Sequence, residues 1–459
     1  MSGSSQLIPA AVGARGKSKG RFAFAFGRLF FLLLLVGLVW IGPAWSDPKY
    51  LLGMALWDMV VLALWVVDFR RLPRPEEIEV RRLWHATLQL RENTEASLEF
   101  TNRGNIAIFL WVQDEVPVGL RKETPELQTI VAAGATQLTT YPICPGERGD
   151  MIFGVTHLRY QSPWQMAERW ASASLKQTIR IYPNLQESKK DTIYLIRSRQ
   201  IALEKRHKHL PGQGREFESL REYRETDEWR DICWSATARR AKLISKSYQT
   251  ERSQTVWLVL DAGRLMRTRV KGLSKLDYAV GAALALAQVA LYSGDRVALL
   301  GYGRRVLQRL SPGRGSAHVR ALLEGLALVR GEELEADHRR AVEALAVLQK
   351  RRSLVVWLTD LAETATTPEV IESAMHMAQR HLVLFTVIGQ PELRALVQER
   401  PETPRAMFRR TAALEIVQRR DLLLRTLRQQ GALTLEVEPA RLSTAVVNQY
   451  LMAKDHSLI

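Results

Sequence analysis

The C-terminal half of the chain alternates between buried-strand patterns and apolar-faced helical patterns, and this alternation constrains the fold most. Apolar runs with the length of buried strands lie at residues 255–260, 296–301, 353–359 and 381–387, and helical periods separate them. Such alternation is typical of a mostly parallel sheet with helices on both faces. We therefore predict a doubly wound α/β domain over residues 253–459.

Two aspartates close strands of this predicted sheet. Asp261 ends the first strand, and Asp360 ends the strand that begins at Ser353. Ligands of doubly wound sheets bind at the carboxyl ends of the strands, near the point where the strand order reverses. The two acids are therefore the first candidate site in the chain.

The N-terminal region holds two apolar runs behind a basic segment. Residues 1–28 carry five basic side chains and no acidic one, and residues 29–67 contain the two runs, the second interrupted by Asp58. A cleaved signal peptide is the alternative for the first run alone. We predict a basic cytoplasmic tail followed by two transmembrane helices, with Asp58 at a helix–helix contact. Basic residues flank both ends, so the positive-inside rule places the soluble domains in the cytoplasm, at a bacterial inner membrane.

Composition narrows the partners only partly. The 459 residues include 65 Lys and Arg against 48 Asp and Glu, a net charge of +17, which favours an anionic partner. The basic residues are dispersed and no nucleic-acid reader motif is present, so we expect contact with membrane lipid and no nucleic acid. The two cysteines exclude a disulfide-rich scaffold and a four-cysteine zinc site.

Two segments lie between the apolar runs and the α/β domain. Residues 78–184 show short alternating stretches separated by turn clusters, which predicts a small antiparallel β-sandwich. This segment contains no cluster of catalytic residue types, and we expect a spacer or docking module. Residues 185–252 are dense in charges of both signs. We expect them to form an ordered, salt-bridged segment that packs on the next domain.

The charged segment contains a signature: Gly-x-Gly-x-Glu-Phe, then Leu-Arg-x-Tyr, an aspartate, Arg-x-Ile-x-Trp and Ala-Arg. No strand leads into the Gly-x-Gly and no Lys-Ser/Thr follows it, so a nucleotide-binding loop is not predicted. The apolar members are expected to pack against the α/β domain. For the charged members, internal ion pairs and a partner surface both stay open. The candidate signature or partner-binding residues are Gly212, Gly214, Glu216, Arg221, Tyr223, Asp227, Arg230, Trp234 and Arg239.

This signature, directly before an α/β domain, resembles the domain of unknown function 58 family. These are membrane-anchored proteins with a von Willebrand factor A-like domain, associated with MoxR-type AAA+ ATPases. The two strand-end aspartates resemble part of the cation site of that domain, whose first loop reads Asp-x-Ser-x-Ser. Here the loop reads Asp261-Ala262-Gly263-Arg264-Leu265, so both serine positions are lost.

The resemblance implies a non-enzymatic, membrane-anchored adaptor or assembly factor. It would present its A-type domain to a MoxR-type AAA+ ATPase in a chaperone-like system, with an unknown client protein. The alternative is a Mg²⁺-dependent protein-binding module that acts without an ATPase. Because two hydroxyl ligands are missing, we expect no metal at the remnant Asp261 and Asp360, or only weak Mg²⁺ binding. Arg264 is a further candidate, as an internal counter-ion for both acids.

An enzyme is not expected, and neither is a resident cofactor. His207 and His209 beside Glu204 have the residue types of metal ligands, but basic neighbours disfavour a cation there. Cys233 has no histidine nearby in sequence to activate it as a nucleophile. We therefore predict no catalytic residues.

Overall fold

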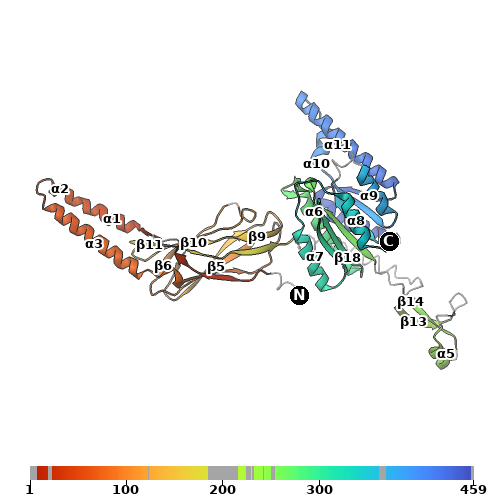
Figure 1. The fold of residues 1–459 in the computed structure, drawn as a ribbon, viewed down its shortest axis with the longest axis horizontal. Helices are drawn as coiled ribbons and strands as arrows, with labels where there is room; N and C mark the ends of the chain where they lie inside the picture. The colour runs from red at the N-terminus through yellow and green to blue at the C-terminus, as the bar shows by residue number, and fades with distance from the viewer. Residues whose placement is uncertain are drawn as a thin grey trace. The chain divides into compact units, whose positions relative to one another are not determined.

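The computed structural model describes residues 8–18, 23–121, 123–184, 216–223, 229, 232–240, 242–249, 254–360 and 368–455. The chain divides into two compact units, Met1–Asn184 and Leu185–Ile459 (Figure 1). The first unit is built mainly from antiparallel strands, and the second contains a six-stranded sheet with helices on both faces.

Twelve described strands build the first unit. They form one sheet of order β1-β4-β5-β8, a second of order β2-β11-β10-β6-β7 with β3 on β11, and the pair β12-β9. Residues Ile78, Val80 and Trp84 of β4 alternate into the core, as a half-buried strand requires. The bounds are β1 Val12–Arg15, β2 Lys17–Ser18, β3 Phe24–Phe26, β4 Ile78–Trp84, β5 Thr94–Asn102, β6 Ile108–Asp114, β7 Glu126–Val131, β8 Thr136–Ile143, β9 Gly149–Phe153, β10 Thr156–Gln161, β11 Ala167–Ala173 and β12 Gln177–Ile181.

The predicted transmembrane hairpin over residues 29–67 is wrong. The first apolar run gives α1 (Arg28–Gly37), a 3-10 turn η1 (Leu38–Trp40) and the four-residue α2 (Ile41–Ala44). Together they cover Arg28–Ala44, which is shorter than the about 20 residues that a transmembrane helix needs. Among the described residues, only the helix that begins at Tyr50 has the length and composition to cross a membrane, and core helices and signal sequences share those properties.

The predictions of a multi-pass inner-membrane protein and of a basic N-terminal tail are also wrong. A multi-pass protein of the inner membrane needs a second spanning helix, and the described residues contain one candidate. Arg15 and Lys17, the described basic residues before α1, also lie in strands β1 and β2 and not in a tail. Val12 of β1 lies opposite Arg82 of β4, while β2 and β3 pair with β11. Strands β1, β2 and β3 of the N-terminal segment are therefore part of the sandwich.

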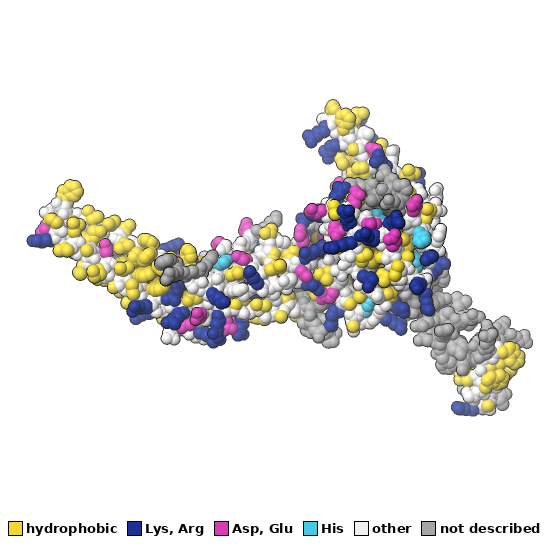
Figure 2. All heavy atoms as spheres, in the orientation of Figure 1, with side chains coloured by type: hydrophobic (Ala, Val, Ile, Leu, Met, Phe, Trp, Pro, Cys, Tyr) yellow, Lys and Arg dark blue, Asp and Glu magenta, His cyan; other side chains and the backbone are white. Residues whose placement is uncertain are grey.

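Helix α3 (Tyr50–Arg71) packs against α1. The Trp57 indole nitrogen donates a hydrogen bond to the Leu33 carbonyl oxygen at 2.9 Å. Gly37 stands directly against Trp57 and Asp58, and a side chain there would meet both. Asp58 thus lies at a contact between α1 and α3. The outward faces of the two helices are apolar and exposed (Figure 2).

The C-terminal end of α3 is joined to the sandwich by Asp68, which is 1% exposed. Its carboxylate accepts hydrogen bonds from the Ser162 hydroxyl at 2.5 Å and from the backbone N–H groups of Met166 and Ala167 at 3.2 and 2.9 Å. A buried carboxylate with three donors is satisfied without a cation. Helix α3 and strand β11 therefore share one polar anchor.

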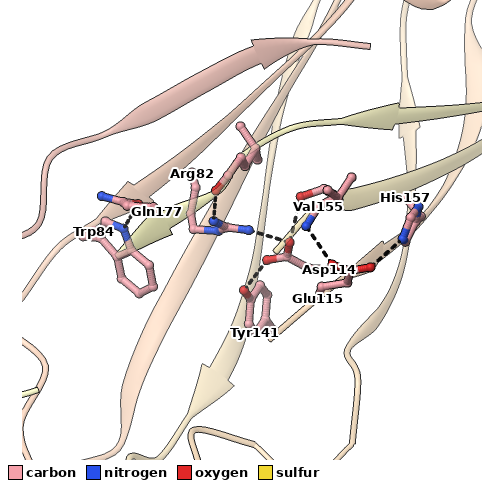
Figure 3. A network of polar contacts seen from close by, with 10 residues as sticks. Arg82, Trp84, Asp114, Glu115, Tyr141, Val155, His157 and Gln177 are labelled. Carbon is pink, nitrogen blue, oxygen red and sulfur yellow. Dashed lines mark hydrogen bonds and ion pairs between the residues drawn. The ribbon is translucent and has the colours of Figure 1, made fainter. Parts of the chain in front are cut away.

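The sandwich core contains a buried ion pair between its two main sheets. Arg82 and Asp114 have no exposed side-chain surface and lie 2.5 Å apart. Figure 3 shows Arg82 and Tyr141 pointing at the Asp114 carboxylate. Tyr141 and Thr156 donate to this carboxylate at 2.6 and 2.7 Å, and Arg82 also donates to the Leu175 carbonyl at 2.8 Å. Burial raises the pKa of Tyr141, so its hydroxyl stays a donor.

The main sheet of the second unit has the order β19-β18-β15-β20-β21-β22. Strand β19 is antiparallel to β18, and the other neighbours are parallel. The strands are β15 Thr255–Asp261, β18 Arg296–Tyr302, β19 Val306–Gly313, β20 Leu354–Thr359, β21 Leu382–Ile388 and β22 Leu433–Val437. The short strands are β13 Glu216–Glu222, β14 Ile244–Gln249, β16 Arg269–Val270 and β17 Leu273–Ser274.

Helices cover both faces of this sheet (Figure 1). Alternate residues of β15, such as Trp257 and Val259, share one core with side chains of α8, α9 and α11. Residues Val256 and Leu258 point to the opposite face, where α6 and α12 pack together. The α-helices described in the second unit are α5 Trp234–Arg240, α6 Lys275–Tyr292, α7 Ser316–Leu328, α8 His338–Leu348, α9 Pro368–Ala378, α10 Pro391–Gln398, α11 Pro404–Gln429 and α12 Leu442–Asp455.

The ion pair of the sandwich core predicts that removing Asp114 costs much more folding stability than removing its neighbour Glu115. Asp114→Ala leaves Arg82 buried without its partner, so we expect the free energy of unfolding to fall by about 3–5 kcal/mol. Glu115 is half exposed and pairs with His157 at the surface, and Glu115→Ala should cost less than about 1 kcal/mol. Urea unfolding of both variants checks this, and equal losses would contradict it.

Candidate functional site

Asp261 and Asp360 lie where the strand order of the α/β sheet reverses. From β15 the chain proceeds outward through β18 and β19, whereas from β20 it proceeds to the other side through β21 and β22. Asp261 is the last residue of β15, and Asp360 directly follows β20. Because β15 and β20 are parallel neighbours, both acids stand at the carboxyl edge that commonly binds ligands.

Asp261 is buried and bonded within its own loops. It is 3% exposed, and it accepts hydrogen bonds from the Gly263 N–H at 2.7 Å and from the Thr359 hydroxyl at 2.6 Å. Burial raises the pKa of Asp261, while the charge of His338 and these two donors act against the shift. Each carboxylate oxygen therefore already has a donor from the chain.

Asp360 is held between two buried cations. One oxygen pairs with the Lys275 ammonium, and the other lies 3.1 Å from the Arg420 guanidinium. Lys275 begins α6 and has no exposed surface, and Arg420 of α11 is 3% exposed. Burial lowers the pKa of Lys275, and the attraction of Asp360 opposes this shift. Glu436 adds a second acid 3.5 Å from Arg420.

Behind the acids lies a group of buried polar rings. The Trp357 indole donates to the Tyr302 hydroxyl at 2.6 Å, and this hydroxyl lies 2.8 Å from Nδ1 of His338. Burial lowers the pKa of His338 and raises that of Tyr302 well above its ordinary value. Both directions favour the neutral forms of these two side chains.

The arrangement has the chemistry of a structural ion pair. Mg²⁺ needs oxygen ligands in near-octahedral geometry, and here it would have to displace an ammonium and a guanidinium from Asp360. Within the part of the chain that the structure describes, no group of three or more His, Cys, Asp or Glu residues is placed to hold a metal ion. Arg264, the counter-ion proposed from the sequence, is half exposed and pairs with Glu335 at 3.5 Å.

The signature residues lie around a small hairpin where they are described. Strands β13 and β14 pair antiparallel, with α5 between them in the chain. Glu216 and Arg221 belong to β13, Tyr223 follows it, and Trp234 and Arg239 belong to α5. Trp234 is 63% exposed. The structure does not describe Gly212, Gly214, Asp227 and Arg230, and the packing of this segment on the α/β domain stays a prediction.

The residues considered for catalysis are not assembled into a site by the described part of the chain. Cys233 precedes α5, its N–H donates to the Ile244 carbonyl at 2.8 Å, and its sulfur lies 3.4 Å from the Ser235 hydroxyl. His207, His209 and Glu204 lie outside the described residues.

Sequence reasoning missed Lys275 and Arg420, although both carry a signal. Ser274 and Asp277 form a capping box that starts α6, and a lysine in the first turn opposes the helix dipole. Such a lysine indicates a local anion. Arg420 lies on the buried stripe of α11, which otherwise consists of apolar residues. An arginine in that position indicates a buried acid.

Removal of one cation tests the importance of the ion pair. Lys275→Met leaves Asp360 buried with Arg420 alone, and we expect the free energy of unfolding to fall by about 3–5 kcal/mol. Adding Asp360→Leu should recover part of the loss, because no unpaired acid then remains. Arg264→Met is the matched control at an exposed pair, with a cost below about 1 kcal/mol. Denaturant unfolding measures all three, and equal losses at residues 264 and 275 would contradict the assignment.

The pKa of Asp261 predicts a pH dependence. The folded state holds the Asp261 proton more tightly than the unfolded chain, where an aspartate has a pKa of about 3.9. Stability from this group is therefore present below that value and is lost as pH rises through the folded pKa. Asp261→Asn should gain stability relative to the unmodified protein as pH rises from 4. Urea midpoints between pH 4 and 8 measure this difference, and parallel curves would contradict it.

Residues 219–398 match the model of a family described as "Protein of unknown function DUF58". Uncharacterized proteins of Mycobacterium bovis and Mycobacterium tuberculosis are each 25% identical over 184 residues, which is 40% of this chain. The matched part covers 57% of the length of these curated relatives.

Similar solved structures show only weak likeness. The conserved hypothetical protein BatB from Bacteroides thetaiotaomicron is 13% identical, with a TM-score of 0.32. The alignment covers 44% of this chain and all of the BatB chain. A PapD-like domain of human CEP192 is 12% identical, with a TM-score of 0.18. The alignment covers 24% of this chain and 87% of that domain. The matched segment includes Asp261, Asp360 and most of the signature, and over these residues the chain is similar to the protein family of unknown function DUF58.

Proposed function

We propose that the chain is a non-enzymatic adaptor or assembly factor. It presents an α/β domain of the von Willebrand factor A type to a MoxR-type AAA+ ATPase, in a chaperone-like system that acts on a client protein. The support for the ATPase as partner is the family resemblance of the signature. The support for a binding function rather than a catalytic one is the geometry at Asp360.

The pairing of Asp360 with Lys275 and Arg420 is the observation that carries the proposal. General acid–base or metal chemistry at this edge needs a carboxylate that is free to meet a substrate or cation. Asp360 instead neutralises two buried cations of its own chain, and Asp261 accepts two internal hydrogen bonds. Recognition by this domain would then use its surface and need no resident cofactor. For the same reason we do not favour the Mg²⁺-dependent alternative.

The described part of the signature has the composition of a partner surface. Trp229 and Trp234 are 71% and 63% exposed, and Arg239 is exposed on the same short helix as Trp234. Tryptophan and arginine dominate the binding energy of many protein interfaces, because each combines a large contact area with directed polar groups. We therefore propose Trp234 and Arg239 as contacts to the ATPase.

Copurification tests the proposed function. The tagged full-length protein, expressed at its native level, should recover a MoxR-type AAA+ ATPase in an amount that depends on ATP. Trp234→Ala with Arg239→Glu should reduce the recovery at least tenfold, because the exposed anchors are lost. Trp170→Ala, at an exposed tryptophan of the sandwich, is the matched control and should leave it unchanged. Quantitative mass spectrometry measures the recovery, and its failure to detect the ATPase with the unmodified protein would reject the adaptor function.

A further inference from the structure

Helix α11 has two faces with opposite environments. Its inner face is buried through Ala413, Leu423, Leu424 and Leu427, which pack against the sheet and α9. The residues opposite this face are exposed over the full length of the helix. A helix that only covers a sheet has a polar outer face. The outer face of α11 departs from this rule.

Large apolar side chains form a stripe along the outer face. Met407, Leu414 and Leu422 are 63%, 41% and 68% exposed. Their spacing of seven and eight residues places them on one side of the helix, over about 22 Å. Phe408, 78% exposed, lies beside the first of them. Single exposed apolar residues are ordinary, but three aligned ones with a fourth beside them are typical of an interaction surface.

The N-terminal part of α11 is a projecting arm. Between Pro404 and Ala412 every residue is exposed except Ala406, which is half-buried. Helix α10 packs beside this part, and Arg410 donates to the Val397 carbonyl at 3.0 Å. Figure 1 shows α11 extending beyond the sheet, and Figure 2 shows hydrophobic and basic side chains on this arm. Burial in its own domain therefore stabilises the arm little, and a partner would supply the missing contacts.

The charge of α11 selects the kind of partner. The helix contains seven arginines and two acids, Glu415 and Asp421, and of these arginines Arg420 is buried against Asp360. Two copies of such a helix repel each other. A lipid surface fits poorly, because Thr411 and Gln418 interrupt the stripe and leave no broad apolar face to insert. An apolar groove with carboxylates on its rim complements both the stripe and the arginines.

We propose that the outer face of α11 is a docking surface for a partner protein with an acid-rimmed apolar groove. Met407, Leu414 and Leu422 enter the groove as the anchors of a helix-in-groove contact, with Phe408 at its edge. Exposed arginines such as Arg419 and Arg425 pair with the rim. None of these residues belongs to the signature or is Asp261 or Asp360, so this surface holds whether or not the adaptor proposal does.

Site-specific photocrosslinking in the native cells tests this surface. The probe is p-benzoylphenylalanine placed in the full chain at Phe408 or Leu422, and at Val347 of α8 as the control. Val347 is 76% exposed, close to the value of Phe408. We expect one protein to crosslink at residues 408 and 422 and not at 347, through a peptide rich in Asp and Glu. That protein is then purified and its affinity for the full chain is measured.

Phe408→Asp and Arg425→Glu should each weaken this binding at least tenfold, whereas Val347→Asp and Arg339→Glu on α8 should leave it unchanged. Thermal melting confirms that the variants fold, as expected for exposed positions.

Any of the following results would overturn the proposal. These are adducts with a second copy of this chain, binding to anionic phosphatidylglycerol vesicles that the same variants abolish, adducts equally strong at residue 347, no adduct, or equal affinities for all variants.

Discussion

The pairing of Asp360 with Lys275 and Arg420 is the interaction on which the architecture of the α/β domain depends. It joins the start of α6, the end of β20 and the middle of α11, and thus ties both helical layers to the centre of the sheet. None of these charges is tolerable in the core alone, since an unpaired buried ion costs several kcal/mol. The pair therefore specifies how the two layers sit, because each helix must bring its cation to the same carboxylate.

The sandwich solves a related problem with the same chemistry. Arg82 and Asp114 pair across its two sheets, and Tyr141 and Thr156 occupy the remaining acceptor positions of the acid. Each unit thus contains a buried aspartate, Asp114 or Asp360, whose carboxylate oxygens are fully occupied by cations or neutral hydrogen-bond donors. In each case the polar group gives one arrangement an advantage over others that would leave a charge unpaired.

The sequence predicted what depends on local pattern and missed what depends on long-range contact. The strand before Asp261 lies within β15, and Asp360 follows β20 as expected, because runs of buried β-branched and aromatic residues identify central strands. The two cations were missed, since they come from residues 85 and 60 positions away from Asp360. The membrane hairpin was predicted from hydropathy, but the first run forms only the shorter helical stretch Arg28–Ala44, with a 3-10 turn after Gly37. The strands before it were missed because their partners, β4 and β11, lie far along the chain.

The anchor at Asp68 makes α3 and the sandwich mechanically one body. Helix α3 has 22 residues, about 33 Å in length, and three hydrogen bonds fix its C-terminal end to strand β11 and the loop before it. The C-terminal end of α3 is therefore held in place by these bonds, while its N-terminal end lies one helix length away. A small sideways force at its far end becomes a torque on β11, the strand that also holds β2 and β3. A force applied to the N-terminal end of α3 is therefore transmitted through Asp68 to β11 and the strands paired with it.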